Sequence, residues 1–147
     1  MIFIMRWQGA SLITPVSTKG IIDLEFAKTP ERFLQLQLFM DQSKLRINLY
    51  LDFLFMGAYV WFLITACRYI QYKTNWTRAS IIFSSLALSA GLFDFAENFL
   101  LLLLLEGRFD ASILEVVYYC AAIKFILAGS VLVYLLFSWP FSLRRKS

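Results

Sequence analysis

The most informative segment of the sequence is Gly91-Leu-Phe-Asp94-Phe-Ala-Glu97-Asn98-Phe-Leu, which continues into the unbroken leucine run 101–105. On a helix, Asp94, Glu97 and Asn98 lie at i, i+3 and i+4 and therefore project from one face. Further back, that face carries the small residues Gly91, Ala90 and Ala87. Because lipid does not favour such a face, we expect it to pack against neighbouring helices, with the acids turned into a protein interior.

The composition extends this interpretation to the whole chain. Apolar residues make up 60% of the 147 residues and aromatic residues 18%, which is more than a soluble domain usually contains. Three apolar runs, at about 49–70, 79–105 and 113–137, are each long enough to cross a hydrocarbon layer, which takes roughly 20 helical residues. We therefore predict an all-α membrane protein whose three transmembrane helices form a bundle over 49–137, with the lipid bilayer as its partner.

Several function classes are disfavoured by what the chain contains. The net charge is +4 without a large basic or acidic block, so we expect no nucleic-acid partner. The chain has no histidine, the commonest general base and transition-metal ligand, and we predict no catalytic residue, metal or cofactor. Cys67 and Cys120 lie far apart in apolar segments and are interpreted as small apolar side chains rather than a disulfide.

Residues 1–48 are predicted to lie outside the membrane. The alternation of Ile22, Leu24 and Phe26 with acidic residues predicts a short extended piece on the surface. Thr29-Pro30-Glu31 predicts the capped start of a surface helix over about 30–41, which must be covered by the membrane interface or by the bundle. We expect the polar residues 41–46 to separate this helix from the first span, and Trp139-Pro140 to end the last one.

The distribution of Lys and Arg predicts an orientation. The connector with Arg68, Lys73 and Arg78 lies on the same side as the tail 138–147, which is predicted to rest on anionic headgroups. Its basic residues are Arg144, Arg145 and Lys146. On the other side of the membrane, acidic residues offset the charge of the lysine and arginine residues. By the positive-inside tendency, the carboxyl terminus is therefore cytoplasmic and the amino-terminal segment is outside.

The intramembrane polar residues fall at similar depths. A rise of 1.5 Å per residue puts Asp52 about 5 Å, Asn98 about 10 Å, Glu97 about 12 Å and Asp94 about 16 Å from the outer span ends. Lys124 comes out about 15 Å deep, so it can meet Glu97 or Asp94. One lysine cannot neutralise three acids. Either an acid is protonated, or a cation or an arginine such as Arg46 completes the balance.

Three interpretations of these residues stay open. The polar network either fixes helix packing in an accessory protein, alone or in a larger membrane complex, or binds a proton, cation or small ligand through Asp94 and Glu97. Three helices enclose little volume, so transport would require an oligomer. A lipid-modifying enzyme is the remote alternative. The small residues of all three spans are predicted to form helix contacts: Gly57, Ala87, Ala90, Gly91, Ala128 and Gly129.

Several segments also share a family pattern. These are Thr14-Pro15, the stretch 20–29, Leu51-Asp-Phe-Leu-Phe55, Gly91-Leu-x-Asp-x-x-Glu-Asn98 and Lys124-Phe125. In this order they resemble a group of small, functionally uncharacterised bacterial integral membrane proteins. The resemblance covers most of the chain and implies a location in the bacterial inner membrane. It supports the topology and the choice of polar residues, and it implies no activity.

Overall fold

A computed structural model of the chain describes residues 12–107 and 110–144. Within these ranges every regular element is a helix: α2 (Ile21–Glu25), α3 (Pro30–Phe39), α4 (Gln42–Thr74), α5 (Thr77–Leu105) and α6 (Ala111–Arg144). Three of them, α4, α5 and α6, are long and apolar enough to cross a membrane. The predicted all-α fold with three such helices is confirmed.

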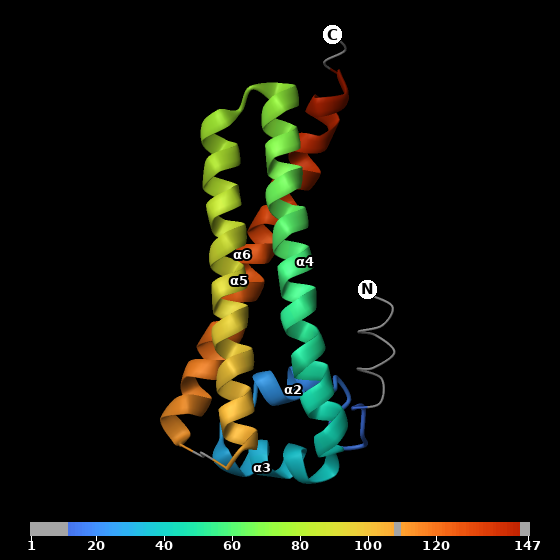
Figure 1. Cartoon of the computed structure of the whole chain (residues 1–147), viewed down its shortest axis with the longest axis vertical. Coiled ribbons are helices and arrows are strands. Elements are labelled where there is room, and N and C mark those ends of the chain that lie inside the picture. Colours follow the sequence, from blue (N-terminus) through green and yellow to red (C-terminus); the bar gives the residue numbers. More distant parts are fainter. Residues whose placement is uncertain (1–11, 108–109, 145–147) are drawn as a thin grey trace.

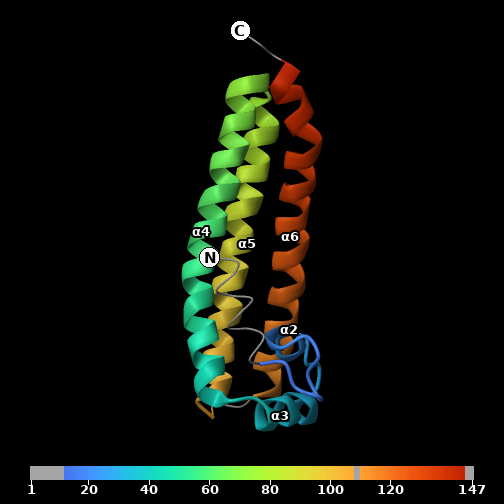
Figure 2. The ribbon, with the colours of Figure 1, turned by 90° about the vertical axis from the view of Figure 1, so that its right-hand side faces the viewer.

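The three long helices run alongside one another in an up-and-down arrangement (Figures 1 and 2). The two short helices α2 and α3 gather at the end of the bundle where α4 begins and α5 gives way to α6. We call this the capped end. The α4–α5 connection and the end of α6 lie at the opposite end, called the open end. The amino-terminal helices and the end of α6 thus lie at opposite ends of the bundle, as the predicted topology requires.

Helix α4 begins earlier than the sequence predicts. The polar residues 42–46 do not form a break but are the first turn of the helix, because Asp41 serves as its N-cap. The Asp41 carboxylate accepts hydrogen bonds from the backbone N–H groups of Ser43 (2.9 Å) and Lys44 (3.3 Å). The Thr29 side chain caps α3 in the same way, by accepting from the Arg32 N–H at 3.3 Å, as predicted. Helix α3 then ends at Phe39.

The extended piece predicted around Ile22 is wrong, because residues 21–25 form the short helix α2. Gly20 precedes it with φ 64°, a conformation that glycine adopts without strain. A lone strand would leave backbone groups without partners, whereas a helical turn pairs several of them internally. Five alternating residues cannot distinguish the two structures.

Helix α6 also continues past its predicted stop. Pro140 lies inside the helix, which runs to Arg144. Proline removes one backbone hydrogen bond, but aromatic contacts on both sides of Pro140 hold this part of the helix against α4 and the α4–α5 connection. Trp139 packs on Tyr69 with ring centroids 6.0 Å apart, and Phe141 packs on Trp76 at 5.5 Å. The Arg144 side chain, Arg145 and Lys146 lie outside the described residues.

Two separate apolar cores hold the bundle together. The core of the capped end joins α2, α3 and the adjoining turns of the long helices; it includes Leu24, Phe33, Leu36, Leu45, Leu49, Leu101, Leu104, Leu114 and Val117. The core of the open end joins the long helices alone and consists of Leu63, Cys67, Ile70, Ala87, Val131 and Tyr134. Phe83 stacks on Tyr134 there, with centroids 4.1 Å apart. The polar residues of the spans lie between the two cores along the chain.

Candidate functional site

The acidic face of α5 is buried, and Lys124 of α6 reaches it. Asp94, Glu97 and Asn98 are at most 4% exposed, and Lys124 is 7% exposed. The Lys124 Nζ lies 2.8 Å from Asp94 Oδ1 and 2.8 Å from Glu97 Oε2. The predicted meeting of the lysine with these acids is confirmed, because the antiparallel helices bring residues of equal depth together.

Helix α4 joins the cluster through two side chains. The Asn98 amide donates to Asp52 Oδ2 at 2.7 Å and, more weakly, to Asp94 Oδ1 at 3.5 Å. The Tyr59 hydroxyl donates to Asp94 Oδ2 at 2.9 Å. Asn98 therefore bridges two acids, and Asp94 receives hydrogen bonds from all three long helices. Tyr59 was missed in the sequence, although it lies two helical turns after Asp52 and thus on the same face.

The amino-terminal part of the chain contributes a fourth acid, Glu25 of α2. Its Oε2 lies 3.7 Å from the Lys124 Nζ, and its side chain is buried. The sequence offered only a weak signal, a carboxylate between Leu24 and Phe26. Burial raises the pKa of Glu25 to about 7, although the nearby Lys124 ammonium acts in the opposite direction. Glu25 thus titrates near neutral pH.

We call the residues Glu25, Asp52, Tyr59, Asp94, Glu97, Asn98 and Lys124 the polar layer. It contains four carboxyl groups and one ammonium group. Arg46 does not neutralise the excess of acidic groups in this layer, because its guanidinium donates instead to the Leu105 carbonyl at 3.4 Å. Within the described chain, Glu97 Oε1, Glu25 Oε2 and Asn98 Oδ1 are buried without a hydrogen-bond partner. The layer therefore has spare acceptors, which a bound proton would turn partly into donors.

The predicted packing residues divide into two groups. Ala87, Ala90 and Gly91 are buried on α5, and a Cβ atom at Gly91 would lie only 2.6 Å from Val60 Cγ2 of α4. These helices therefore approach closely at Gly91. By contrast, a Cβ atom at Gly57 or Gly129 would meet no atom within 4 Å, and Ala128 is only half-buried. The described chain alone therefore does not make the predicted helix contact at Gly57 and Gly129.

The remaining candidates for a reactive or metal-binding group add little to the polar layer. Cys67 and Cys120 are both buried free thiols. In residues 12–107 and 110–144, no group of three or more Cys, Asp or Glu side chains is arranged to hold a metal ion. Asp110, at the start of α6, has its pKa lowered by hydrogen bonds from the Ser112 backbone and side chain.

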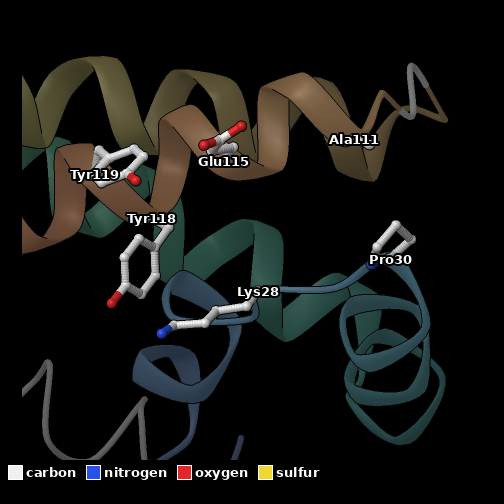
Figure 3. Close-up of a pocket in the computed structure, with 6 residues that line it drawn as sticks. All are labelled: Lys28, Pro30, Ala111, Glu115, Tyr118 and Tyr119. Atoms are coloured by element: carbon white, nitrogen blue, oxygen red, sulfur yellow. The ribbon is translucent and has the colours of Figure 1, made fainter.

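A cavity of about 390 Å³ lies at the capped end between the α2–α3 connection and α6 (Figure 3). It is lined by Lys28, Pro30, Ala111, Glu115, Tyr118 and Tyr119. The Lys28 ammonium sits 4.9 Å from the Tyr118 ring centroid, a cation–π contact. Because the lining contains both an acid and a base, the cavity does not select a net charge.

No protein-family model, curated protein sequence or solved structure matches this chain. The structure itself therefore indicates the class of the molecule. Its features are those of a small helical membrane protein: three helices able to span a bilayer, and a buried polar layer that links all three to a short amino-terminal helix.

Proposed function

We propose that this chain is an accessory protein of the bacterial inner membrane, in which the polar layer fixes the packing of the amino-terminal helices on the transmembrane bundle. The observation that carries this proposal is the position of Lys124. Its ammonium is shared between α5, through Asp94 and Glu97, and α2, through Glu25. A single side chain of α6 thus connects α5 to α2, which together with α3 forms what we call the cap.

The energetics indicate that the polar layer selects one arrangement of the helices and does not simply add stability. A charge near the bilayer centre costs at least about 2.5–3.5 kcal/mol when it is unpaired, so each member of the layer requires the others. Well-packed apolar residues would stabilise a bundle at least as well as a buried ion pair. What the polar layer adds is selectivity, because sliding one helix by a turn would separate Lys124 from its acids.

The surface of α3 supports an interaction role. Phe33 and Leu36 are buried in the capped end, whereas Leu34, Leu38 and Phe39 are exposed. An apolar face at the end of a membrane bundle suits insertion into the interface or contact with a further membrane protein, which includes a second copy of this chain. The polar layer would hold that face in a fixed position.

The positive-inside distribution supports an orientation with the capped end outside and the open end in the cytoplasm. Single exposed thiols test this in a Cys67→Ala, Cys120→Ala background. A membrane-impermeant maleimide applied to intact spheroplasts should label Thr18→Cys at the capped end and spare Thr77→Cys at the open end. Permeabilised cells, in which both should react, are the control. The reverse pattern would invert the orientation.

A second function, proton binding or transfer, is favoured by the surplus of acids. Glu25 and Glu97 both approach the Lys124 ammonium and repel each other when both are ionised. Burial of two such carboxyls favours a state in which one of them holds a proton. The buried Glu97 Oε1, which lacks a partner in the described chain, is a position for that proton.

Liposomes distinguish the two functions. The protein is reconstituted in phosphatidylethanolamine and phosphatidylglycerol vesicles that contain a pH-sensitive dye, and an acid pulse is applied outside. The accessory role predicts proton entry equal to that of protein-free vesicles, for the wild type and for Glu97→Gln alike. Proton entry above that level, lost in Glu97→Gln but kept in the exposed control Glu115→Gln, would replace the accessory role by transport.

A further inference from the structure

A continuous groove runs along the outer side of the α4–α5 seam, apart from the polar layer. It consists of two adjoining hollows of about 370 and 590 Å³ that share Ile64 and Leu88. The hollow nearer the middle of the helices is apolar; it is lined by Met56, Gly57, Val60, Trp61, Gly91, Leu92 and Phe95. Gly57 leaves this part open, because no side chain fills the space beside it.

The other part of the groove, toward the open end, is polar. Its lining includes Arg68 and Gln71 of α4 and Ser80, Ser84 and Ser85 of α5. Arg68 is exposed, and none of the described residues that line this part is acidic. Within the described chain, this part therefore offers one positive charge with neutral hydrogen-bonding groups around it, which is complementary to a single anion.

The position along the helix suits a membrane boundary. Helix α4 has 33 residues and is about 50 Å long, whereas the hydrocarbon core of a bilayer measures about 30 Å. Arg68 lies about 9 Å from the end of α4, so it falls near the boundary between hydrocarbon and headgroups. Tyr69, Tyr72 and Trp76 lie beyond it, where interfacial aromatic residues are expected. The apolar hollow then falls within the hydrocarbon core.

We propose that this groove binds one anionic phospholipid, with the phosphate on Arg68 and Gln71 and an acyl chain along Ile64, Gly57 and Leu88. The order of the lining matches the order of the lipid, a charged group at the boundary followed by an apolar chain directed toward the bilayer centre. Trp61, which is 72% exposed, forms one side of the acyl part. This lipid site is independent of the accessory role of the polar layer.

The headgroup preference follows from a comparison of the two polar hollows. The cavity at the capped end pairs Lys28 with Glu115, so it offers a partner both to a phosphate and to an amine. The groove at Arg68 has no carboxylate to receive an amine. It should therefore prefer a net anionic lipid such as phosphatidylglycerol over the zwitterionic phosphatidylcholine.

Native mass spectrometry of the purified full-length chain in mild detergent tests this proposal. Phosphatidylglycerol or phosphatidylcholine with matched acyl chains is titrated, and the dissociation constant of the first bound lipid is measured. We expect the wild type to bind phosphatidylglycerol at least roughly tenfold more tightly, which corresponds to about 1.4 kcal/mol. Inorganic phosphate at the same concentration should not displace it, because it has no acyl chain.

Two pairs of variants locate the site. Arg68→Gln should remove the preference for phosphatidylglycerol, whereas Arg78→Gln, which changes an exposed arginine outside the groove lining, should keep it. Gly57→Leu should fill the apolar part and weaken both lipids roughly tenfold. Gly129→Leu is its matched control, because a Cβ atom at either glycine meets no other atom within 4 Å and both variants should fold.

Equal affinity of the wild type for the two lipids would overturn the proposal, as would equal affinity of Arg68→Gln and Arg78→Gln for phosphatidylglycerol. A wild-type dimer that Gly57→Leu converts to a monomer, with lipid affinity unchanged, would also overturn it. In that case a second copy of the chain occupies the groove.

Discussion

The two ends of the bundle are built differently. At the capped end, α2 and α3 share an apolar core with all three long helices, and Phe26, which follows α2, contacts both Tyr118 (centroids 5.6 Å apart) and Phe125 (6.1 Å) of α6. Toward the open end, among the described residues, the long helices pack only on each other around a smaller core, and a groove runs along the α4–α5 seam from the middle of these helices. The polar layer separates the two regions. One end is closed by the chain itself, and the other presents its side chains to its surroundings.

The two ends also differ in how polar residues contribute to their packing. Glu25 extends the polar layer to α2, so the layer links a short amino-terminal helix to the long helices of the bundle. The open end uses aromatic stacking and a hydrogen bond from the Ser80 hydroxyl to the Cys67 carbonyl at 2.6 Å. Changes to the layer should therefore affect the whole fold, and changes at the open end should remain local.

The largest effect is expected for Lys124→Met. It leaves the carboxylates of Asp94, Glu97 and Glu25 without their cation, and breaking a buried pair costs about 3–5 kcal/mol. The free energy of unfolding in detergent at pH 8 should fall by that amount. Lys44→Met is the matched control, since its 3.9 Å ion pair with Asp41 is half exposed and should contribute less than about 1 kcal/mol.

The docking of the cap should depend on pH. The pKa of Glu25 is about 7 in the docked state, above its ordinary value of 4.5, so this state binds more protons between these values. Docking is therefore strongest below pH 4.5 and weakens as the pH rises through 7, by at most about 3 kcal/mol. Hydrogen exchange of the α2 backbone, corrected for intrinsic rates, should show protection falling over this range.

Glu25→Gln supplies the control for the cap, because an amide does not titrate. Protection of α2 in this variant should show much less dependence on pH over the same range. A wild-type profile that is independent of pH, or one in which protection rises with pH, would contradict a neutral Glu25 in the docked state.

A smaller effect is expected at the close approach of α4 and α5. Gly91→Ala places a Cβ atom against Val60 and should destabilise the bundle by about 1–3 kcal/mol, the usual range for overpacking. Gly57→Ala, one helical turn before Val60, meets open space and should be neutral or stabilising by up to about 1 kcal/mol because alanine favours helices. Thermal unfolding of the two variants should therefore shift in different directions.

The smallest effect is expected for Ser80→Ala at the open end. The variant loses one hydrogen bond between helices, and such bonds in membrane proteins contribute about 0.6 kcal/mol on average. Protection from hydrogen exchange should decrease near Cys67 and remain unchanged in α2. A loss of protection in α2 would show that the two ends are not independent.

Much of this architecture was predictable from the sequence. The long apolar runs predict the spans, and the i, i+3, i+4 spacing of Asp94, Glu97 and Asn98 predicts their common face. The depth of Lys124 in its span predicts its partners. Helices have a fixed rise per residue and neighbouring spans run in opposite directions, so few acidic residues fall at the same depth as Lys124.

The missed features depend on tertiary contacts. Glu25 joins the layer only because α2 folds back against α6, and nothing in residues 21–25 alone shows this contact. Gly57 and Gly91 both border the groove on neighbouring helices, yet an added Cβ atom would meet open space at Gly57 and the Val60 side chain at Gly91. Helix α6 passes Pro140 because distant aromatic side chains hold its last turn. Local sequence carries none of this information.

A double-mutant cycle shows whether Lys124 and its acidic partners act as one structural unit. The unfolding free energies of Lys124→Met, Asp94→Asn and the double variant are measured in detergent and compared with the wild type. We expect a coupling energy of at least about 1 kcal/mol, so that the double variant loses less stability than the sum of the single variants. Additive losses, or an Asp94→Asn variant as stable as the wild type, would contradict it.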